Sequence, residues 1–560
     1  MRKLLLSMIF IISGTLIFAQ TAKKTQESEV EEEIELPDVT TVVNGKTFTV
    51  GKDSVPDYTK ILPESSSPEV QLPVMKKDSD AKKEAAVKNA PGKKSKDIYA
   101  EGELGAGCPF YFKGDFSVYR ASGNSPFEID FNHESAEGFA GKKSNEGYFA
   151  RSTAVRGKQS LFTNSGKHRA EASYRMSDDG LQLKSAAYSD MVKHTIYADA
   201  GSDWNLSNGI LISYGADGAW FNRYGEIMKD TEISGDFMDT TKIVDVNPYL
   251  GLGWAGKGFK IMLTSYYGFQ GNLEKSGNIL EIENSSNRNA SHRGQFKLGF
   301  SWANDFLTAG ADGSLIIGTA TGEKDILPAF TGIIDFKTES FTEGRFVTLS
   351  ARGGLESYQE KIRNLENRYR FAVAPAIPTE TTDWFSTVDL TVPVLSAFEA
   401  KAGFEFRKTA FENGLWEAEY DSQVPKSGLY IIGAKERTEY DTNFGFFADF
   451  APVKAGIEWK AYWKDVPALS DEHKIKASVE YQSLDAKWNA GTSGALSLGK
   501  DADKCPDLSL WAGVRLAPAL SLAFEVNDVI KLCNASSRDY AHSGYITTSG
   551  NAVLLAKFQF

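Results

Sequence analysis

The feature that most constrains this chain is an alternation of apolar and polar residues with a period of two, which recurs from Ile98 almost to the C-terminus. Successive side chains of a β-strand point to opposite faces, so the pattern predicts strands with one apolar and one polar face. It extends over about 460 residues without a clear helical interruption. One example places apolar residues at Val453, Ala455, Ile457, Trp459, Ala461 and Trp463.

Three features favour a barrel that crosses a membrane over a large soluble β-sandwich. Single sandwiches rarely reach this length. The polar faces carry many charges, and short turns alternate with long loops, as in outer-membrane barrels. Lipid offers no partner for backbone N–H and C=O groups, so the sheet must close on itself. We therefore predict an all-β fold with a single transmembrane antiparallel β-barrel. A propeller or solenoid is less favoured because no fixed-length repeat is present.

The predicted barrel has about 22 strands, with 24 as the alternative, because such barrels have even strand numbers. Strands counted back from Phe560 and forward from Ile98 disagree by one between residues 319 and 382. The count includes one long strand at 428–450. It predicts outer loops at residues 134–165, 224–240, 271–291, 408–427, 464–472, 499–507 and 527–550.

The N-terminal residues 1–19 read as a secretory signal peptide. Arg2 and Lys3 precede the mostly apolar run 4–18, and the small residue Ala19 precedes the expected cleavage site. That run is too short to span a bilayer as a helix. We therefore expect export to the outer membrane of a diderm bacterium, where the barrel would contact lipid and lipopolysaccharide.

Residues 20–97 have a different composition from the barrel region 98–560. They contain acidic and lysine-rich runs, and their only aromatic residues are Phe48 and Tyr58. Such a segment cannot bury enough apolar surface to fold, so we predict a disordered periplasmic segment. One patch is rich in β-branched residues and could add a strand to the edge of a partner's sheet. It consists of Asp38, Val39, Thr40, Thr41, Val42 and Val43.

Composition excludes several classes of function. The net charge of −12 argues against nucleic-acid binding. Six histidines without metal-ligand spacing and three cysteines without a CxxC pair predict no metal site, no cofactor and no catalytic site. Cys505 and Cys533 fall on neighbouring predicted outer loops, and a disulfide between them is one of two open outcomes, with Cys108 left over.

Charged residues on the polar faces of the predicted strands are expected to line the lumen. In this position they would solvate the inner wall rather than bind a specific ligand. The residues assigned to the lumen are Glu399, Lys401, Glu405, Arg407, Lys454, Glu458 and Lys460.

The C-terminus resembles the last strand of bacterial outer-membrane proteins, with Phe558 and the terminal Phe560 as the signal for the insertion machinery. The segment 519–530, Tyr540, Tyr545 and the strand 551–560 also resemble the end of a TonB-dependent receptor barrel. The patch 38–43 is similar to that family's TonB box. Only 54 residues, 44–97, separate it from Ile98, whereas the family has a much longer folded plug. The resemblance is therefore to a plugless or remodelled relative.

The resemblance implies an outer-membrane transporter for an unknown small solute, with TonB or another periplasmic protein bound at the N-terminal segment. A passive diffusion porin is the first alternative, and a structural or adhesive barrel acting through its outer loops is the second. An enzyme is not expected, since His133 and His542 near predicted outer strand ends have no catalytic motif around them.

Overall fold

The structure is a computed structural model of the 560-residue chain. It describes residues 98–227, 240–273, 290–322, 324, 326–339, 345–411, 414–423, 427–500, 502–503, 505–548 and 550–560, and the backbone of 41–43 and 46–48. The expected signal peptide and Asp38, Val39 and Thr40 lie outside the described residues. Residues 1–60 and 61–560 form two separate units and are described one at a time.

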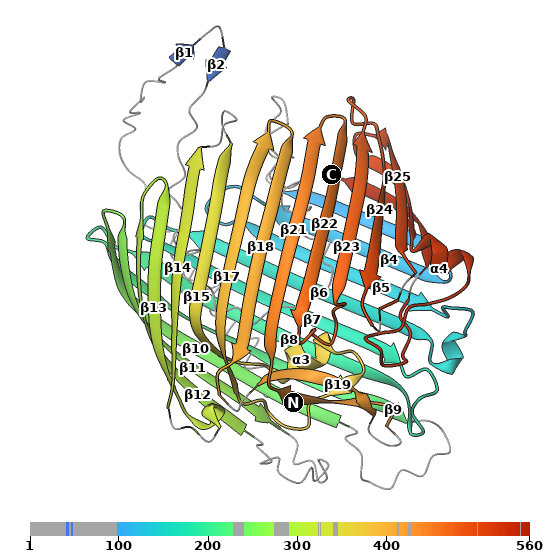
Figure 1. Ribbon diagram of the computed structural model, residues 1–560, viewed down its shortest axis with the longest axis horizontal. Coiled ribbons are helices and arrows are strands. Elements are labelled where there is room, and N and C mark those ends of the chain that lie inside the picture. Colours follow the sequence, from blue (N-terminus) through green and yellow to red (C-terminus); the bar gives the residue numbers. More distant parts are fainter. Residues whose placement is uncertain are drawn as a thin grey trace, which may run out of the picture. The chain divides into compact units, whose positions relative to one another are not determined.

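The second unit is a closed antiparallel barrel, which confirms the predicted fold and the strand number of about 22 (Figure 1). Strand β27 pairs with β3, and this pair closes the sheet. The 22 wall strands are β3 (Tyr99–Cys108), β4 (Tyr111–Arg120), β5 (Phe127–Glu137), β6 (Phe149–Phe162), β7 (Gly166–Gly180), β8 (Tyr188–Asn205), β9 (Ile210–Ile227), β10 (Thr240–Gly256), β11 (Phe259–Asn272), β12 (Ala290–Ala303), β13 (Leu307–Ile317), β14 (Ile326–Glu339), β15 (Phe346–Gln359), β17 (Glu380–Leu395), β18 (Phe398–Thr409), β21 (Thr438–Phe450), β22 (Val453–Lys464), β23 (His473–Gln482), β24 (Trp488–Leu498), β25 (Asp507–Ala517), β26 (Leu520–Asn527) and β27 (Asn551–Gln559).

The barrel has a turn end, where short turns join the strands and Phe560 lies, and a loop end with the longer connections. Two details of the sequence interpretation are wrong. The expected outer loop 134–165 contains strand β6, so only residues 138–148 connect β5 to β6 at the loop end. The expected strand 428–450 is two strands, because β20 (Tyr430–Lys435) belongs to a separate small sheet and β21 begins at Thr438.

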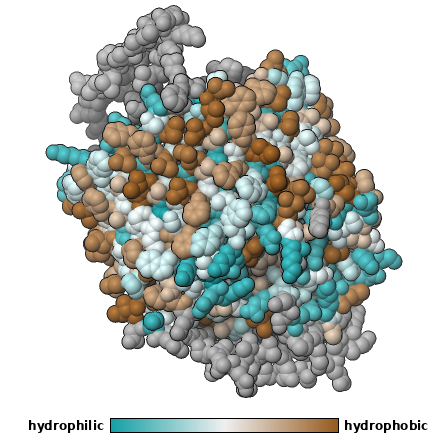
Figure 2. Space-filling model, in the orientation of Figure 1, coloured by the Kyte–Doolittle hydropathy of each residue, from teal (hydrophilic) through white to brown (hydrophobic). Residues whose placement is uncertain are grey.

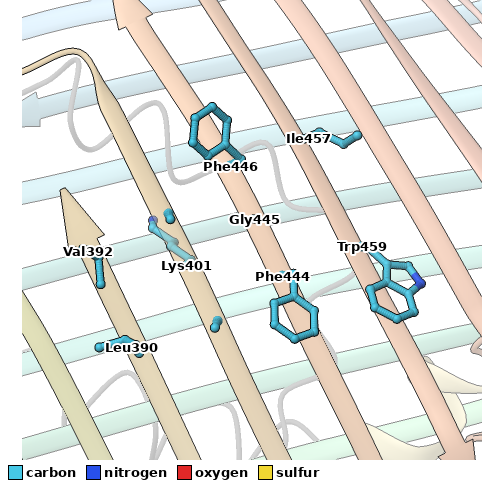
Figure 3. A pocket seen from close by; sticks show the side chains of 10 residues that line it. Leu390, Val392, Lys401, Phe444, Gly445, Phe446, Ile457 and Trp459 are labelled. Carbon is cyan, nitrogen blue, oxygen red and sulfur yellow. The ribbon is translucent and has the colours of Figure 1, made fainter. Parts of the chain in front are cut away.

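The outer surface of the wall is apolar, as the alternation requires. Figure 2 shows apolar side chains spread over the visible strands. Large side chains such as Trp254, Trp463 and Trp488 are about half exposed on this surface. Phe444, Phe446, Ile457 and Trp459 stand on the outer side of β21 and β22, where they line a shallow apolar hollow with Leu390 and Val392 (Figure 3). A surface of this kind suits contact with acyl chains.

The described part of the first unit is a short hairpin. Strand β1 (Thr41–Val43) pairs with β2 (Lys46–Phe48) in an antiparallel register that sets Val43 opposite Lys46. The two residues between the strands are Asn44 and Gly45, the commonest sequence for a tight hairpin turn. The β-branched patch found in the sequence therefore supplies one strand of this hairpin.

Several loop-end connections carry structure of their own. Residues 360–379, between β15 and β17, contain helix α3 (Ile362–Arg368) and strand β16 (Ala372–Val373). Strand β16 joins β20 and β19 (Leu415–Gln423) in a three-stranded sheet, and α4 (Val529–Cys533) lies between β26 and β27. Among the described residues, no helix is long and apolar enough to cross a membrane.

The tip of the β15–β17 hairpin leaves the wall. The ladder between β14 and β15 ends at Phe330 and Leu355, although β14 begins four residues earlier and β15 continues to Gln359. The β15–β17 ladder continues to the pair Gln359 and Glu380. Arg293 of β12 binds this tip, with Nη2 2.8 Å from Glu380 Oε1 and 3.4 Å from the Ser357 carbonyl oxygen. The tip thus lies inside β13 and β14 and reaches β12.

Gly354 is the residue at which β15 begins to depart from the wall. Residues other than glycine rarely adopt its φ of +155°, and a Cβ atom at this position would lie 2.0 Å from the Phe330 carbonyl oxygen. The apolar cluster Ile316, Leu327 and Ala329 is buried on the inner side of β13 and β14, while Phe330 is 46% exposed on the outer side. Glycine at position 354 therefore allows β15 to leave the wall at the edge of this cluster.

We expect Gly354→Ala to destabilise the barrel by about 1–3 kcal/mol, because alanine strains the backbone and meets the Phe330 carbonyl. On electrophoresis of samples heated in detergent, the folded barrel gives a compact band and the unfolded chain a separate one. The variant should change from the first band to the second at a lower temperature than the wild type. Gly313→Ala in β13 is the matched control, since a Cβ atom there has no neighbour within 4 Å. Equal conversion temperatures for the two variants would contradict this role of Gly354.

Candidate functional site

Residues 360–379, named here the inner loop, form the centre of the candidate site. Ile362 and Leu365 are spaced to share one face of α3, and both are fully buried. Arg368 lies in the last turn, where a cation favours the helix C-terminus. Two charged side chains of the helix, Arg363 and Glu366, contact the barrel wall.

A buried ion pair joins the inner loop to β9. Arg223 Nε lies 2.8 Å from Glu366 Oε2, and the two side chains are 2% and 0% exposed. Arg223 also donates to Thr241 Oγ1 of β10 at 2.7 Å, and the other Glu366 oxygen accepts from the Ala374 N–H at 3.1 Å. A buried pair of this kind must be complete, because removing one partner leaves an uncompensated charge.

Lys193 of β8 provides a second buried cation for the same loop. Its ammonium group donates to the carbonyl oxygens of Glu366 and Arg370, the latter at 3.0 Å. Both carbonyls come from the end of α3 and the residues just after it, where helix carbonyls lack internal partners. Lys193 therefore acts as a C-terminal cap for α3 that is supplied by the wall.

The start of the inner loop binds β10 and β11. Arg363 Nε lies 3.0 Å from Asp245 Oδ2, and Lys361 Nζ donates to Asn247 Oδ1 at 2.9 Å. Gln270 accepts from the Ile362 N–H at 2.8 Å, which satisfies one of the unpaired donors at the helix start. We call the contacts of Lys193, Arg223, Asp245, Asn247 and Gln270 with the inner loop the polar clamp.

The opposite side of the inner loop packs on two other loops. Phe371 stacks on Tyr545 of the β26–β27 loop with ring centroids 3.8 Å apart. Tyr540 of the same loop donates to the Arg368 carbonyl at 3.0 Å and accepts from the Arg370 N–H at 3.1 Å. The parallel pairing of β16 with β20 adds the β18–β21 loop to this assembly.

The inner loop therefore crosses the lumen at the loop end. The polar clamp lies on β8 to β11, whereas the loop itself springs from β15 and β17, several strands further round the wall. Arg370 extends the contact to Asp179 of β7, with Nε 3.1 Å from Oδ1. Figure 1 shows α3 and β19 between the front and back walls, at the end opposite the chain's C-terminus.

The residues predicted to line the lumen lie on β18 and β22, on the faces opposite the exposed apolar residues. Arg407 binds Glu405 at 2.5 Å and Glu356 of β15 at 3.1 Å, and Lys401 binds Glu399 at 3.1 Å. The other three form weaker cross-strand contacts. These are Lys460 with Asp441 at 3.8 Å, Lys454 with Asp449 at 3.7 Å, and Glu458 opposite Lys476 in the ladder. None belongs to the polar clamp.

The two C-terminal aromatic residues lie at the seam that closes the barrel. Phe558 packs against Phe116 of β4 with ring centroids 5.5 Å apart, and Phe560 is 64% exposed. The backbone of Phe560 exchanges two hydrogen bonds with Ala100, at 2.7 and 3.2 Å. Their use as an insertion signal stays a prediction.

Cys108, Cys505 and Cys533 are free thiols in this structure, so the Cys505–Cys533 disulfide considered from the sequence is not formed in it. Ion pairs connect the two loops instead. Asp503 binds Lys531 at 2.9 Å and Arg538 at 3.1 Å. A disulfide in the oxidised protein stays a prediction. His133 of β5 hydrogen-bonds Thr153 at 2.8 Å, and His542 lies in the β26–β27 loop.

The polar clamp and the inner loop are the parts of the site that the sequence interpretation missed. Two signals were available. The strand counts disagreed within 319–382, which contains the inner loop, and Ile362 and Leu365 have helical rather than strand spacing. Nothing in the sequence marks Arg223 and Glu366 as partners, because 143 positions separate them.

Comparisons with known proteins agree with the barrel architecture. No protein-family model and no curated protein matches the chain. Solved structures do match. The FrpB iron transporter from Neisseria meningitidis superimposes with a TM-score of 0.61 at 10% identity, over 83% of each chain. A mutant of the ferric enterobactin receptor PfeA from Pseudomonas aeruginosa gives 0.58 at 9% identity, over 83% of this chain and 81% of that one. The copper transporter OprC gives 0.58 at 10%, over 84% and 82%.

These proteins are TonB-dependent receptors. The barrel has the TonB-dependent receptor fold. At such low identity the likeness extends to the fold alone. Among the residues that the structure describes in this chain, those that cross the lumen belong to loop-end connections of the barrel.

We expect Glu366→Ala to release the inner loop, because it leaves Arg223 as a buried cation without its carboxylate, at a cost of about 3–5 kcal/mol. Trypsin should then cut after Lys361, Arg363, Arg368 and Arg370, and mass spectrometry should find new N-termini at Ile362, Asn364, Tyr369 and Phe371. Wild-type protein should resist cutting at these positions.

Glu399→Ala is the control for this experiment. Glu399 and Lys401 are 32% and 50% exposed, so loss of their pair should cost less than about 1 kcal/mol and leave the inner loop uncut. Equal resistance of Glu366→Ala and wild type would show that the buried pair does not hold the inner loop.

Proposed function

We propose that this chain is an outer-membrane transporter that moves a small solute through a lumen closed at its loop end by the inner loop. The observation that carries the proposal is the polar clamp, which fixes a barrel connection across the lumen to strands β8 to β11. A passive porin needs a permanently open path. The neighbouring structures include proteins named as iron and copper transporters, which supports transport but not any particular solute for this chain.

The polar nature of the clamp supports a movable closure rather than a permanent one. Buried ion pairs gain little net free energy, since the cost of desolvation offsets much of their attraction. A solute or water that enters from the loop end can replace one partner and compensate the other. The inner loop therefore acts as a gate. Its polar contacts with the wall keep the lumen closed until a polar ligand competes for the same side chains.

The segment 20–97 is proposed to bind a periplasmic protein of the TonB type through residues 38–43. Their likeness to a TonB box and the strand conformation of Thr41–Val43 support this role. A strand that pairs with a partner's sheet edge needs its backbone N–H groups. Export by the N-terminal signal peptide and a position in the outer membrane belong to the same proposal.

We expect removal of the inner loop to open the lumen. Gln359 and Glu380 are ladder partners, so replacing residues 361–378 by Asn-Gly closes the hairpin with a tight turn. In planar bilayers this variant should show a large, steady conductance, whereas the full-length protein and a form without residues 21–97 should be nearly silent. A large, steady conductance of the wild type would instead make the protein an open porin. Silence of the loop variant would mean that other loops close the lumen.

We expect Val42→Pro to reduce capture of the full-length protein by an immobilised TonB C-terminal domain by about tenfold. Proline removes a backbone donor from the strand that would pair with the partner. Ala86→Pro, in the same segment but outside the β-prone patch, should bind like wild type. Equal capture of both variants, or no capture of wild type, would argue that residues 38–43 do not bind such a partner.

A further inference from the structure

A cluster of buried charged and polar side chains, named here the polar chamber, lies beside the start of the inner loop. Arg437 is at its centre, with Nη2 3.2 Å from Asp383 of β17 and Nη1 2.8 Å from Glu439 of β21. The charges of Asp383, Arg437 and Glu360 lie close enough to Tyr358 to act on its hydroxyl group. The chamber is therefore bounded by the wall strands β15, β17 and β21 and by the first residue of the inner loop.

Several buried polar atoms of the chamber have no hydrogen-bond partner among the described residues. They are the Tyr358 hydroxyl, Glu360 Oε2, Asp383 Oδ1 and Arg437 Nε. Tyr358 is 4% exposed, and Glu360 and Asp383 are fully buried. Buried polar groups in folded proteins are nearly always hydrogen-bonded, so a group of four in one place indicates a site that a ligand or water completes. Three of them can accept a hydrogen bond.

Among the described residues of this chamber, carboxylates outnumber cationic side chains. Each guanidinium is already paired, Arg368 with Glu360 at 3.1 Å, Arg437 with Asp383 and Glu439, and Arg407 with Glu405 and Glu356. These pairs contain three arginines and five carboxylates. Glu417 of the small sheet adds a sixth carboxylate, and Lys435 beside it adds a fourth cation.

The pKa values of the carboxyl groups in the loops also indicate an excess of negative charge. Burial raises the pKa of Glu360 above its ordinary value even though Arg368 and Arg437 favour the charged form. Burial also raises the pKa of Glu417 despite the nearby Arg437 and Lys435. The cations of the protein therefore do not fully compensate these carboxylates, and an added cation with hydrogen-bond donors would.

We infer that this chamber is the solute-binding site and that it takes a small linear organic cation with several N–H donors, which bind Glu360, Asp383 and the Tyr358 oxygen. The inference rests on the proposed function and gives the solute its chemical class. Amine donors match the unpartnered acceptors, and their charge offsets the carboxylate excess. The site adjoins Glu360 of the inner loop, so a bound cation would compete directly with Arg368 for that carboxylate.

The test is calorimetric titration of the full-length protein in detergent with spermidine and with agmatine. Glucose serves as the neutral probe, citrate as the anionic probe and Ca²⁺ as the bare metal ion. We expect binding of at least one amine and of neither glucose nor citrate. Glu360→Gln and Asp383→Asn should each weaken amine binding by about tenfold or more, since each removes charge but keeps volume.

Two further variants separate a binding role from a folding role. Tyr358→Phe keeps the ring and removes only the unpartnered hydroxyl, and it should weaken binding several-fold without changing the heat conversion of the gel band. Glu399→Gln, on the lumen wall outside the chamber, should bind amines like wild type. Unchanged binding in the Glu360 and Asp383 variants, or binding of Ca²⁺ without either amine, would overturn the inference.

The amine-binding experiment and the conductance experiment test the binding site and the transport function separately. Failure of both amines to bind, with the conductance results as expected, overturns the chamber and leaves the transporter. Amine binding that depends on Glu360 and Asp383, in a wild-type protein that conducts steadily, upholds the chamber and overturns the closed lumen.

Discussion

The structure depends on one constraint, which is that every backbone N–H and C=O group within lipid must find a partner in the protein. Closure of the sheet between β27 and β3 satisfies this for the wall. The constraint is relaxed inside the lumen, and the chain uses that freedom at the β15–β17 tip. There the ladder to β14 ends, and the Arg293 side chain serves the Ser357 carbonyl. Structure other than wall strand is thus possible because it lies within the closed sheet.

Closure also decides what kind of contact can hold the lumen shut. Alternation gives most of the wall an apolar outer face and a polar inner face, so a loop that enters the lumen meets charged and amide side chains. The inner loop matches them with Glu366, Arg363 and Lys361. Phe371 and Leu365 join an apolar core with Tyr545 of the β26–β27 loop. Wall residues also belong to this core, namely Met191 of β8, Phe221 of β9 and Ile243 of β10. One short segment therefore combines polar contacts with the wall and an apolar core that is shared by loops and wall strands.

Much of the barrel could be predicted from the sequence, because strand alternation is a local signal that repeats. The position of a residue within the alternating pattern assigns its side chain to the polar or the apolar face of the strand. Arg407 and Ile457 can be assigned in this way without knowledge of the fold. The inner loop gives no such signal. Helix α3 is only seven residues long, and its contacts with Arg223, Asp245 and Lys193 come from distant strands whose charges look like ordinary lumen residues. Only the three-dimensional structure shows which charged residues of the lumen contact the inner loop and which do not.

The difference between polar and apolar closure bears on how the lumen can open. Withdrawal of an apolar plug would expose its surface to water at about 25 cal/mol per Å². The clamp atoms of Arg223, Lys193 and Asp245 can instead exchange protein partners for water or ligand atoms at a much smaller net cost. The apolar contacts of Phe371 with Tyr545 lie within the loop assembly and can move with it. The apolar core also includes Met191, Phe221 and Ile243 of the wall, so a shift of the assembly must separate the polar clamp and part of this apolar core.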